Sequence, residues 1–431
     1  MHSAIRILAA ALAASSLAAV AQSAPLTLAE AQRRAVDRSR QLAAQELAIA
    51  GSRDRAVAAG QLPDPVLKLE LQNVPVEGAD RFRLDRDAMT MRSVGLMQEW
   101  TRAEKRELKR ERFEREAEKT EAEKIASIAA IQKNVALAWL DTYYAQAMVE
   151  VIREQAAAAQ LEITAADSAY RAGRGTQADV LAVHGARSGL EDRTSDFMRK
   201  LRNARTMLAR WVGDAADAPL GTRPDISRMH LQAHSIEHQI SRHPDLEILR
   251  RQEEIARTEA RLAQANTKAD WSFEVMYNNR ASQFGDMATV SVSMPLQLFQ
   301  KDRQGREVAA KLAAVEQARA EREEMERNHT SEIRAIVEEW RSGLERIKRY
   351  ESELLPLSRE RTQASLAAYQ GGKASAGDLL MARRNEIEMR MQALQIESET
   401  ARLWAQLEFL IADPAVLPVG FFGMRTSKDA P

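Results

Sequence analysis

One glycine-centred phrase occurs twice in the chain and constrains the fold more than any other feature. The first copy, AYRAGRGTQADVL, spans residues 169–181, and the second, AYQGGKASAGDLL, spans residues 368–380. The copies align without a gap. Upstream, LKLELQN from Leu67 resembles WSFEVMYN from Trp271. A duplication of this size predicts two copies of one structural unit, each reading helix, strand, strand, long helix, turn and long helix, rather than an array of short repeats.

The predicted helices are unusually long. The stretch from Thr101 to Tyr170 contains no glycine and no proline, and roughly 70 helical residues would extend about 100 Å. Apolar and small residues recur at three- and four-residue steps between Ile128 and Ala145, so coiled-coil packing against neighbouring helices is expected. The charge run KRELKRERFEREAEKTEAEK, which starts at Lys105, is interpreted as a solvated face.

The glycines of the repeated phrase fall between helical patterns, where the left-handed conformation ends a helix at low cost. They are Gly173, Gly175, Gly371 and Gly372. Thr176 and Ser375 are each followed three residues later by aspartate, as at the start of a returning helix. Each phrase is therefore predicted to be a hairpin tip, at about residues 171–177 and 370–376.

Four segments alternate between apolar and polar residues, as β-strands do. They are expected at about residues 66–74, 90–98, 271–278 and 288–296. A soluble sheet that is half buried against helices is the usual meaning of such alternation, but aromatic residues are scarce and little other protein could cover the strands at that end of the helices. In lipid only a closed barrel satisfies every backbone group. Four strands cannot close alone, so several copies would be needed, and the sequence does not choose between two and three.

Composition narrows the function classes for this chain of 431 residues. Its formal net charge is zero, which gives no reason to expect a nucleic-acid partner. It has no cysteine, which excludes disulfides, thiolate metal sites and a lipid anchor on cysteine. No hydrolase, phosphate-loop, dinucleotide or zinc-protease motif is present, so we expect no enzymatic activity and no cofactor.

The domain boundaries follow from the duplication. Residues 1–21 have the charged, apolar and small-residue regions of a secretory signal peptide. The first repeat is expected at residues 22–222 and the second at 243–413, joined by a connector at 223–242. Residues 414–431 form a C-terminal tail.

Several segments resemble the TolC-type outer-membrane factor family over about residues 26–413. They are the opening LTLAEAQRRAV, QLPDP before the first strand, VSVSMPLQLF, HPDL at the start of the second repeat, and both tip phrases. The resemblance implies a homotrimer whose twelve-stranded barrel lies in outer-membrane lipid of a Gram-negative cell and continues into a long periplasmic helical tunnel. It also implies an exit duct that works with a periplasmic adaptor and an inner-membrane transporter.

Two segments resemble the heavy-metal efflux branch of that family, which works with resistance–nodulation–division pumps. They are RSVGLMQEWTRAEKRELKRE and SVSMPLQLFQKDRQ. A duct for drug efflux or type I secretion is the alternative within the channel class. A periplasmic coiled-coil adaptor is the alternative outside it, although an adaptor would not explain two hairpins together with four amphipathic strands.

The resemblance also assigns roles at the tips. Lys373 or Tyr369 of one hairpin would hold Asp179 of a neighbouring one while the duct is closed, and Asp378 would form a ring of three carboxylates that favours cations. The second acid of the family's ring falls at Met381, which implies a less acidic gate. The competing interpretation is that both aspartates simply cap helices.

Two further sets of residues are candidates. Glu70 and Glu274 occupy matched positions on polar strand faces and could line a barrel lumen. His230, His234 and His238 are spaced so that a helix would place them on one face, an arrangement that can bind Zn²⁺. An exposed polar stripe is the alternative for these histidines.

Overall fold

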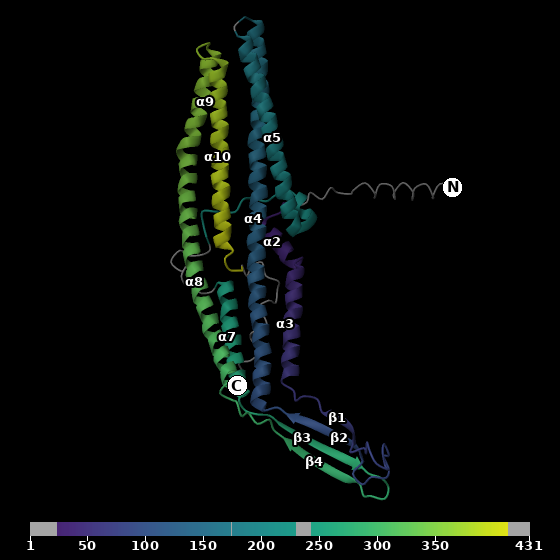
Figure 1. Cartoon of the computed structure of the whole chain (residues 1–431). Coiled ribbons are helices and arrows are strands. Elements are labelled where there is room, and N and C mark those ends of the chain that lie inside the picture. The colour runs from purple at the N-terminus through teal and green to yellow at the C-terminus, as the bar shows by residue number, and fades with distance from the viewer. Residues whose placement is uncertain (1–23, 174, 230–242, 413–431) are drawn as a thin grey trace, which may run out of the picture. The chain divides into compact units, whose positions relative to one another are not determined.

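The computed structural model describes residues 24–173, 175–229 and 243–412. It is mainly helical with one four-stranded sheet, and the order of helices and strands repeats as the sequence predicts (Figure 1). The predicted signal peptide and the C-terminal tail lie outside the described residues, as does most of the predicted connector.

The elements of the two halves correspond closely. The first half comprises α2 (Leu28–Asp37), α3 (Arg40–Ala59), β1 (Val66–Gln72), β2 (Met91–Trp100), α4 (Ala103–Arg171), α5 (Gln177–Val212) and the 3₁₀ turn η1 (Gly213–Asp217). The second half comprises α7 (Pro244–Ala265), β3 (Trp271–Asn279), β4 (Met287–Ser293), α8 (Gln304–Arg349), the π-helical segment η3 (Tyr350–Leu354), α9 (Leu355–Gln370) and α10 (Ala376–Glu408).

The chain forms two compact units. Among the described residues, the hairpin unit contains residues 24–39, 128–173, 175–229 and 332–412, and the sheet unit contains residues 40–127 and 243–331. Helices α4 and α8 each contribute to both units, which is why neither unit is a continuous stretch of sequence.

The hairpin unit has an apolar interior that repeats between the halves. Leu208 and Leu407, which occupy equivalent positions in the duplication, are both fully buried. The indole N–H of Trp139 donates to the carbonyl of Leu26 over 2.9 Å, and that of Trp340 donates to the carbonyl of Ile226 over 3.0 Å. Residue 226 therefore has the same role in the second half as residue 26 has in the first.

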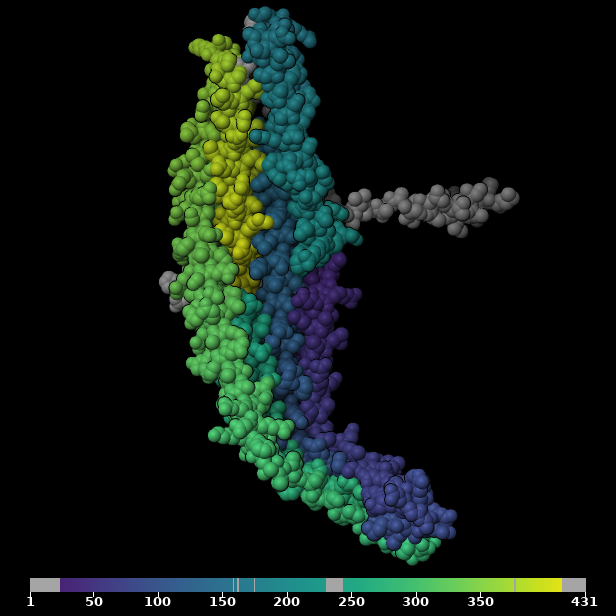
Figure 2. All heavy atoms as spheres, viewed as in Figure 1, coloured from purple at the N-terminus to yellow at the C-terminus, as the bar shows by residue number. Residues whose placement is uncertain are grey.

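Helices α9 and α10 lie side by side up to their turn, as the ribbon and the space-filling view show (Figure 1 and Figure 2). Near the turn between α4 and α5, Ile163, Ala166 and Val183 form a buried cluster against which Leu380 of α10 packs. The long helices are thus stabilised by contact with other helices, as expected for helices whose apolar stripes cannot be buried alone.

In the sheet unit, the charge run on α4 is not the solvated face that we expected. Arg112 donates to Glu259 of α7 over 2.8 Å, and Glu118 accepts from Arg251 of α7 over 3.0 Å. Most side chains of the run are half-buried. Small residues such as Ala117 and Ala122, both buried, let neighbouring helices approach, so the long charged side chains pair between helices.

The four strands form one antiparallel sheet in the order β1-β2-β3-β4 (Figure 1). Strands from both halves therefore meet in the middle, where β3 pairs along its full length with Arg92–Trp100 of β2. The duplication builds one sheet rather than two.

Candidate functional site: the amphipathic sheet and the hairpin tips

One face of the sheet is apolar and exposed across all four strands. The register places Leu69 opposite Val94, Val94 opposite Tyr277, and Tyr277 opposite Ala288. Side chains on this face remain largely accessible, with Leu69 at 74% and Val290 at 73% exposure. The other apolar members of this face are Leu67, Leu71, Leu96, Trp100, Trp271, Phe273, Val275 and Val292. An exposed apolar surface of this extent marks contact with lipid or protein.

Two tryptophans lie at the helix-proximal end of this apolar face. Trp100 ends β2 and Trp271 begins β3, and the register places them directly opposite each other. Both are exposed. In membrane proteins, tryptophan is enriched at the boundary between lipid and water, because its ring is amphipathic.

The opposite face of the sheet is polar and carries both predicted lumen carboxylates. Glu274 accepts a hydrogen bond from the ammonium of Lys68 over 2.8 Å, and Glu70 accepts one from the amide of Gln72 over 2.5 Å. Lys68 lies opposite Gly95 of β2, so the missing side chain lets the lysine reach across β2 to β3. Glu274 is thus one half of a cross-strand ion pair rather than an isolated acid.

Polar contacts on this face continue in the next rows. The hydroxyl of Ser93 donates to the side-chain oxygen of Asn278 over 2.6 Å, and the amide of Asn278 donates to Thr289 over 2.9 Å. The two faces of the sheet therefore differ sharply in character, as expected when one face meets lipid and the other water.

The first hairpin tip is held by a capping box. The side chain of Asp179 accepts from the backbone N–H of Thr176 over 2.9 Å and from its hydroxyl over 2.7 Å. The backbone N–H of Asp179 donates to the same hydroxyl over 3.2 Å. The hydroxyl of Thr176, followed by its backbone N–H, holds the pKa of Asp179 below its usual value.

The second tip repeats this geometry. Asp378 accepts from the backbone N–H of Ser375 over 3.0 Å and from its hydroxyl over 2.7 Å, and its own N–H donates back over 3.2 Å. The pKa of Asp378 is lowered by the same two donors, the hydroxyl first. Both predicted gate acids thus cap helices within this chain, which accounts for their presence without requiring a gate.

Of the four tip glycines, two have the left-handed backbone that was expected. Gly173 has φ +70° and Gly372 has φ +71°, and the two are equivalent in the duplication. Gly371 has φ −79° and instead lies at the C-cap of α9. A Cβ atom added at Gly175 would lie only 3.3 Å from the backbone nitrogen of Tyr170. Glycine at this position therefore lets the backbone of the turn lie close to that of Tyr170.

Tyr369 and Lys373 flank the second turn. Tyr369 is half-buried, Lys373 is exposed, and the backbone N–H of Lys373 closes the turn by donating to the carbonyl of Ala368 over 2.8 Å. The predicted partner of these side chains is Asp179 of another copy, which a single chain does not contain.

Comparison with solved structures identifies the fold. The outer-membrane protein VceC of Vibrio cholerae is similar, with a TM-score of 0.72 at 17% identity over 89% of this chain and 95% of that one. The CmeC outer-membrane channel of Campylobacter jejuni gives 0.73 at 10% identity, over 89% and 85% of the two chains. CusC, which forms a transmembrane channel, gives 0.72 at 15% identity, over 89% and 91%.

This chain has the fold of an outer-membrane channel. No family model and no curated protein sequence matches it, so the similarity lies in the three-dimensional structure. None of the helices in the described ranges is both long and apolar enough to cross a bilayer.

Within this outer-membrane channel fold, one structural contact at the start of β3 was not predicted from the sequence. Asp270, just before β3, accepts from Lys105 over 2.6 Å and from the backbone N–H of Arg102 over 3.0 Å. Burial would raise the pKa of Asp270, but the ammonium of Lys105 and the N–H of Arg102 outweigh it and hold the pKa below its usual value. These two interactions of Asp270 hold the start of α4 against the start of β3.

The predicted histidine site, His230, His234 and His238, lies outside the described residues. His243, the next histidine along the chain, is described and lies beside Asp245 and His329. His329 is more than eighty residues away in sequence, within an ordinary helical pattern, so no local signal could have linked it to His243.

Proposed function

We propose that this chain is one subunit of a passive, non-enzymatic exit duct in the outer membrane of a Gram-negative cell. The observation that carries the proposal is the exposed apolar face of the four-stranded sheet. Backbone groups at the edge of a sheet are unsatisfied in lipid, so such a sheet must be closed into a barrel. The similarity in fold to outer-membrane channels supports the same conclusion.

We propose that three copies close the barrel, which gives twelve strands, four from each chain. Among the strands that the structure describes, β1 and β4 each have a neighbour on one side only. Strands β2 and β3 have 10 and 9 residues, close to the ~9–11 needed to cross a bilayer at a tilt. The edge strands have 7 residues each, and pairing with a neighbouring copy would lengthen them.

We further propose that the duct serves a tripartite efflux system, with a periplasmic adaptor and an inner-membrane resistance–nodulation–division pump, and that it conducts heavy-metal cations. The support for this finer assignment is the resemblance of the segments around β2 and β4 to the heavy-metal branch. Drug efflux or type I secretion remains the competing cargo.

At the tips we propose a gate. Lys373 or Tyr369 of one hairpin holds Asp179 of a neighbouring copy, and three Asp378 side chains form a ring that favours cations. Asp378 is exposed in the single chain, as is Met381 one turn further on. The capping bonds do not exclude this role, because a capping carboxylate keeps its negative charge.

The duct is tested by reconstituting the purified protein in planar bilayers. Discrete conductance steps are expected, together with a preference for cations that is lost in Asp378→Ala and retained in Glu191→Ala, an exposed acid on α5. Absence of conductance would overturn the duct. Unchanged selectivity in Asp378→Ala would refute the ring of Asp378 carboxylates but not the duct.

The cargo is tested by deleting the gene in its host. Growth should become sensitive to cobalt, zinc or cadmium salts while drug sensitivity stays unchanged. The opposite pattern would reassign the cargo to drugs. Fractionation separates the adaptor alternative, because an adaptor would not remain in the outer membrane.

A further inference from the structure

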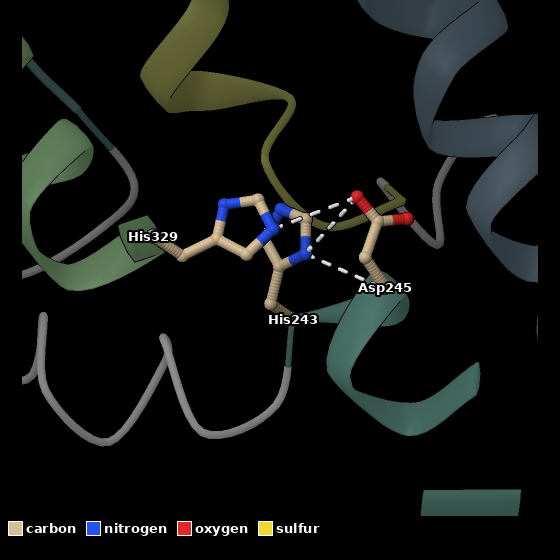
Figure 3. Close-up of side chains that lie close together, drawn as sticks. All are labelled: His243, Asp245 and His329. Atoms are coloured by element: carbon tan, nitrogen blue, oxygen red, sulfur yellow. Dashed lines mark hydrogen bonds and ion pairs between the residues drawn. The ribbon is translucent and has the colours of Figure 1, made fainter. Parts of the chain in front are cut away.

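We propose that His243, Asp245 and His329 form a binding site for a divalent transition-metal cation, with Zn²⁺ as the best-suited ion. All three residues belong to the sheet unit. Their side chains converge from the start of α7 and from the middle of α8 (Figure 3). The site is separate from the sheet and from the tips, and it does not depend on the proposed duct.

The geometry brings three metal-binding atoms close together. Asp245 Oδ2 lies 3.7 Å from His243 Nδ1 and 3.8 Å from His329 Nε2, and the three ligand atoms lie within 4.8 Å of one another. Bonds of about 2.0–2.1 Å in a tetrahedral zinc site place its ligand atoms roughly 3.3 Å apart. The two distances to Asp245 exceed this spacing by roughly half an ångström, and the two imidazole nitrogens, which lie within 4.8 Å of each other, would also approach to complete three corners of a coordination sphere.

The donor set selects the class of ion. Two imidazoles and one carboxylate suit Zn²⁺ and its first-row neighbours, whereas Mg²⁺ and Ca²⁺ prefer oxygen ligands. The two rings lie 4.4 Å apart between centroids, and their side chains are only 11% and 16% exposed, whereas Asp245 is 52% exposed. The carboxylate side is thus open to solvent, which provides a route of entry and room for water as a further ligand.

The internal duplication supplies an independent argument. Trp139 and Trp340 make the same hydrogen bond in the two halves, and the spacing between them carries Ile128 onto His329. Ile128 is fully buried. The second half thus has an imidazole, a metal-binding side chain, where the first half has an apolar core residue.

The helix end sets a limit on affinity. His243 is the N-cap of α7, and its Nδ1 accepts the backbone N–H of Asp245 over 3.2 Å. A cation there competes with this hydrogen bond and meets the positive end of the helix dipole. The carboxylate of Asp245 offsets that repulsion, so Asp245 is as necessary to the site as the histidines.

The test uses the full chain in detergent with His230, His234 and His238 changed to glutamine, so that these residues contribute no binding. We expect this protein to bind one equivalent of Zn²⁺ by calorimetry and to bind Co²⁺ with visible d–d absorption. Asp245→Asn and, separately, His329→Ile should each weaken Zn²⁺ binding about tenfold or more. The matched control is His184→Gln, an exposed histidine on α5, which should change nothing.

Thermal unfolding shows whether a variant fails to bind Zn²⁺ because it has lost the site or because it is misfolded. Zn²⁺ should raise the melting temperature of the starting protein but not that of Asp245→Asn, while both melt alike without metal. No stoichiometric Zn²⁺ binding, undiminished binding in Asp245→Asn, or equal competition by Mg²⁺ would each overturn the site.

Discussion

Gly173 and Gly372 set the conformation of the two tips through a backbone angle that other residues adopt at a cost. Nothing lies within 4 Å of a Cβ atom added at either position, so only the positive φ opposes substitution. We expect Gly173→Ala or Gly372→Ala to destabilise its tip by about 1 kcal/mol. Amide hydrogen exchange of tip peptides should speed up accordingly. Gly371→Ala is the control, because Gly371 has a negative φ, and an equal effect there would contradict this origin.

The capping boxes make the tips sensitive to acid. The pKa values of Asp179 and Asp378 are lowered in the folded chain. Their capping contribution is therefore complete above the unfolded value of about 3.9 and is lost as pH falls through the lowered folded pKa. Tip amides should exchange faster, relative to intrinsic rates, at about pH 3 than at pH 6.

Removing one hydroxyl isolates this effect. Thr176→Ala should cost the first tip about 1 kcal/mol and remove its acid sensitivity, while the second tip, capped by Ser375, keeps its own. Each tip is thus the control for the other. If both tips respond alike in Thr176→Ala, the pH dependence arises from something other than the caps.

At the residue scale, what could be predicted was local. The tip glycines and the pairs of Thr176 with Asp179 and Ser375 with Asp378 are signals contained in four or five consecutive residues. Which glycine takes the positive φ was not predictable, because Gly371 and Gly372 are adjacent and only the hydrogen bonds of the turn distinguish them. His329 and Asp270 were missed because their partners are distant in sequence.

Among the elements, the sheet depends on the absence of a side chain at Gly95. A Cβ there would lie 2.5 Å from Cγ of Met276 and 3.0 Å from the carbonyl of Val275. Gly95→Val should therefore overpack the centre of the sheet and destabilise it by about 1–3 kcal/mol. It should also block the path of Lys68 to Glu274.

Thermal unfolding and loss of the assembled form on unheated gels would measure this change. Gly285→Ala, in the loop between β3 and β4, is the matched control because nothing lies within 4 Å of an added Cβ. An unchanged melting temperature in Gly95→Val would show that the packing against Met276 is not limiting.

The junction of sheet and helix depends on Asp270. Lys105 is buried, at 6% side-chain exposure, so Asp270→Ala leaves its ammonium without that carboxylate and should cost about 3 kcal/mol. The same junction provides the control. Glu104 and Lys268 form an exposed pair, with both side chains more than half exposed, and Glu104→Ala should leave the melting temperature almost unchanged. Equal losses in the two variants would refute a special role for the buried pair.

At the element scale, periodicity located the strands and the long helices well. β1 was expected at residues 66–74 and is Val66–Gln72, and β3 was expected at 271–278 and is Trp271–Asn279. The pairing of β2 with β3 was not predicted, because alternation fixes which face a residue occupies but not which strand lies beside it. The prediction for the charge run from Lys105 was wrong because its pairing partners, on α7 and also Arg53 and Glu46 of α3, leave no trace in its own sequence.

For the whole molecule, the absence of cysteine allows a clean test of assembly. Glu70→Cys in β1 and Ser291→Cys in β4 lie on the same polar face but three strand spacings apart, about 14 Å. A disulfide requires Cα atoms within about 7 Å, so any bond between them must join two chains. Oxidation should give a ladder that ends at the trimer.

The control for this test is Glu70→Cys with Val290→Cys, because Val290 is on the opposite face. Because the register between two chains determines which residue of β4 faces Glu70, Thr289 and Ser293 are tested in the same way as Ser291. Monomer alone for all three positions would contradict closure through β1 and β4.

The number of copies is the feature of the whole molecule that the sequence left open between two and three. Amphipathic edge strands such as β1 and β4 need a neighbouring strand, but a closed ring of two copies and one of three copies would both supply it. The mainly helical fold with a small sheet was predictable because it follows from residue periodicity, whereas subunit number depends on curvature and on contacts between chains.

The π-helical segment Tyr350–Leu354 makes the two hairpins unequal. Two fewer residues separate Trp340 from Tyr369 than separate Trp139 from Tyr170. Two residues fewer shorten the helix by about 3 Å at ~1.5 Å per residue, and the π-helical turn, which holds about one extra residue, shortens it further. The α9–α10 hairpin thus stops roughly a turn short of the α4–α5 hairpin. If several copies assemble as proposed, the hairpin tips around the ring would alternate between two heights, and a protein that docks there would have to contact tips at both heights.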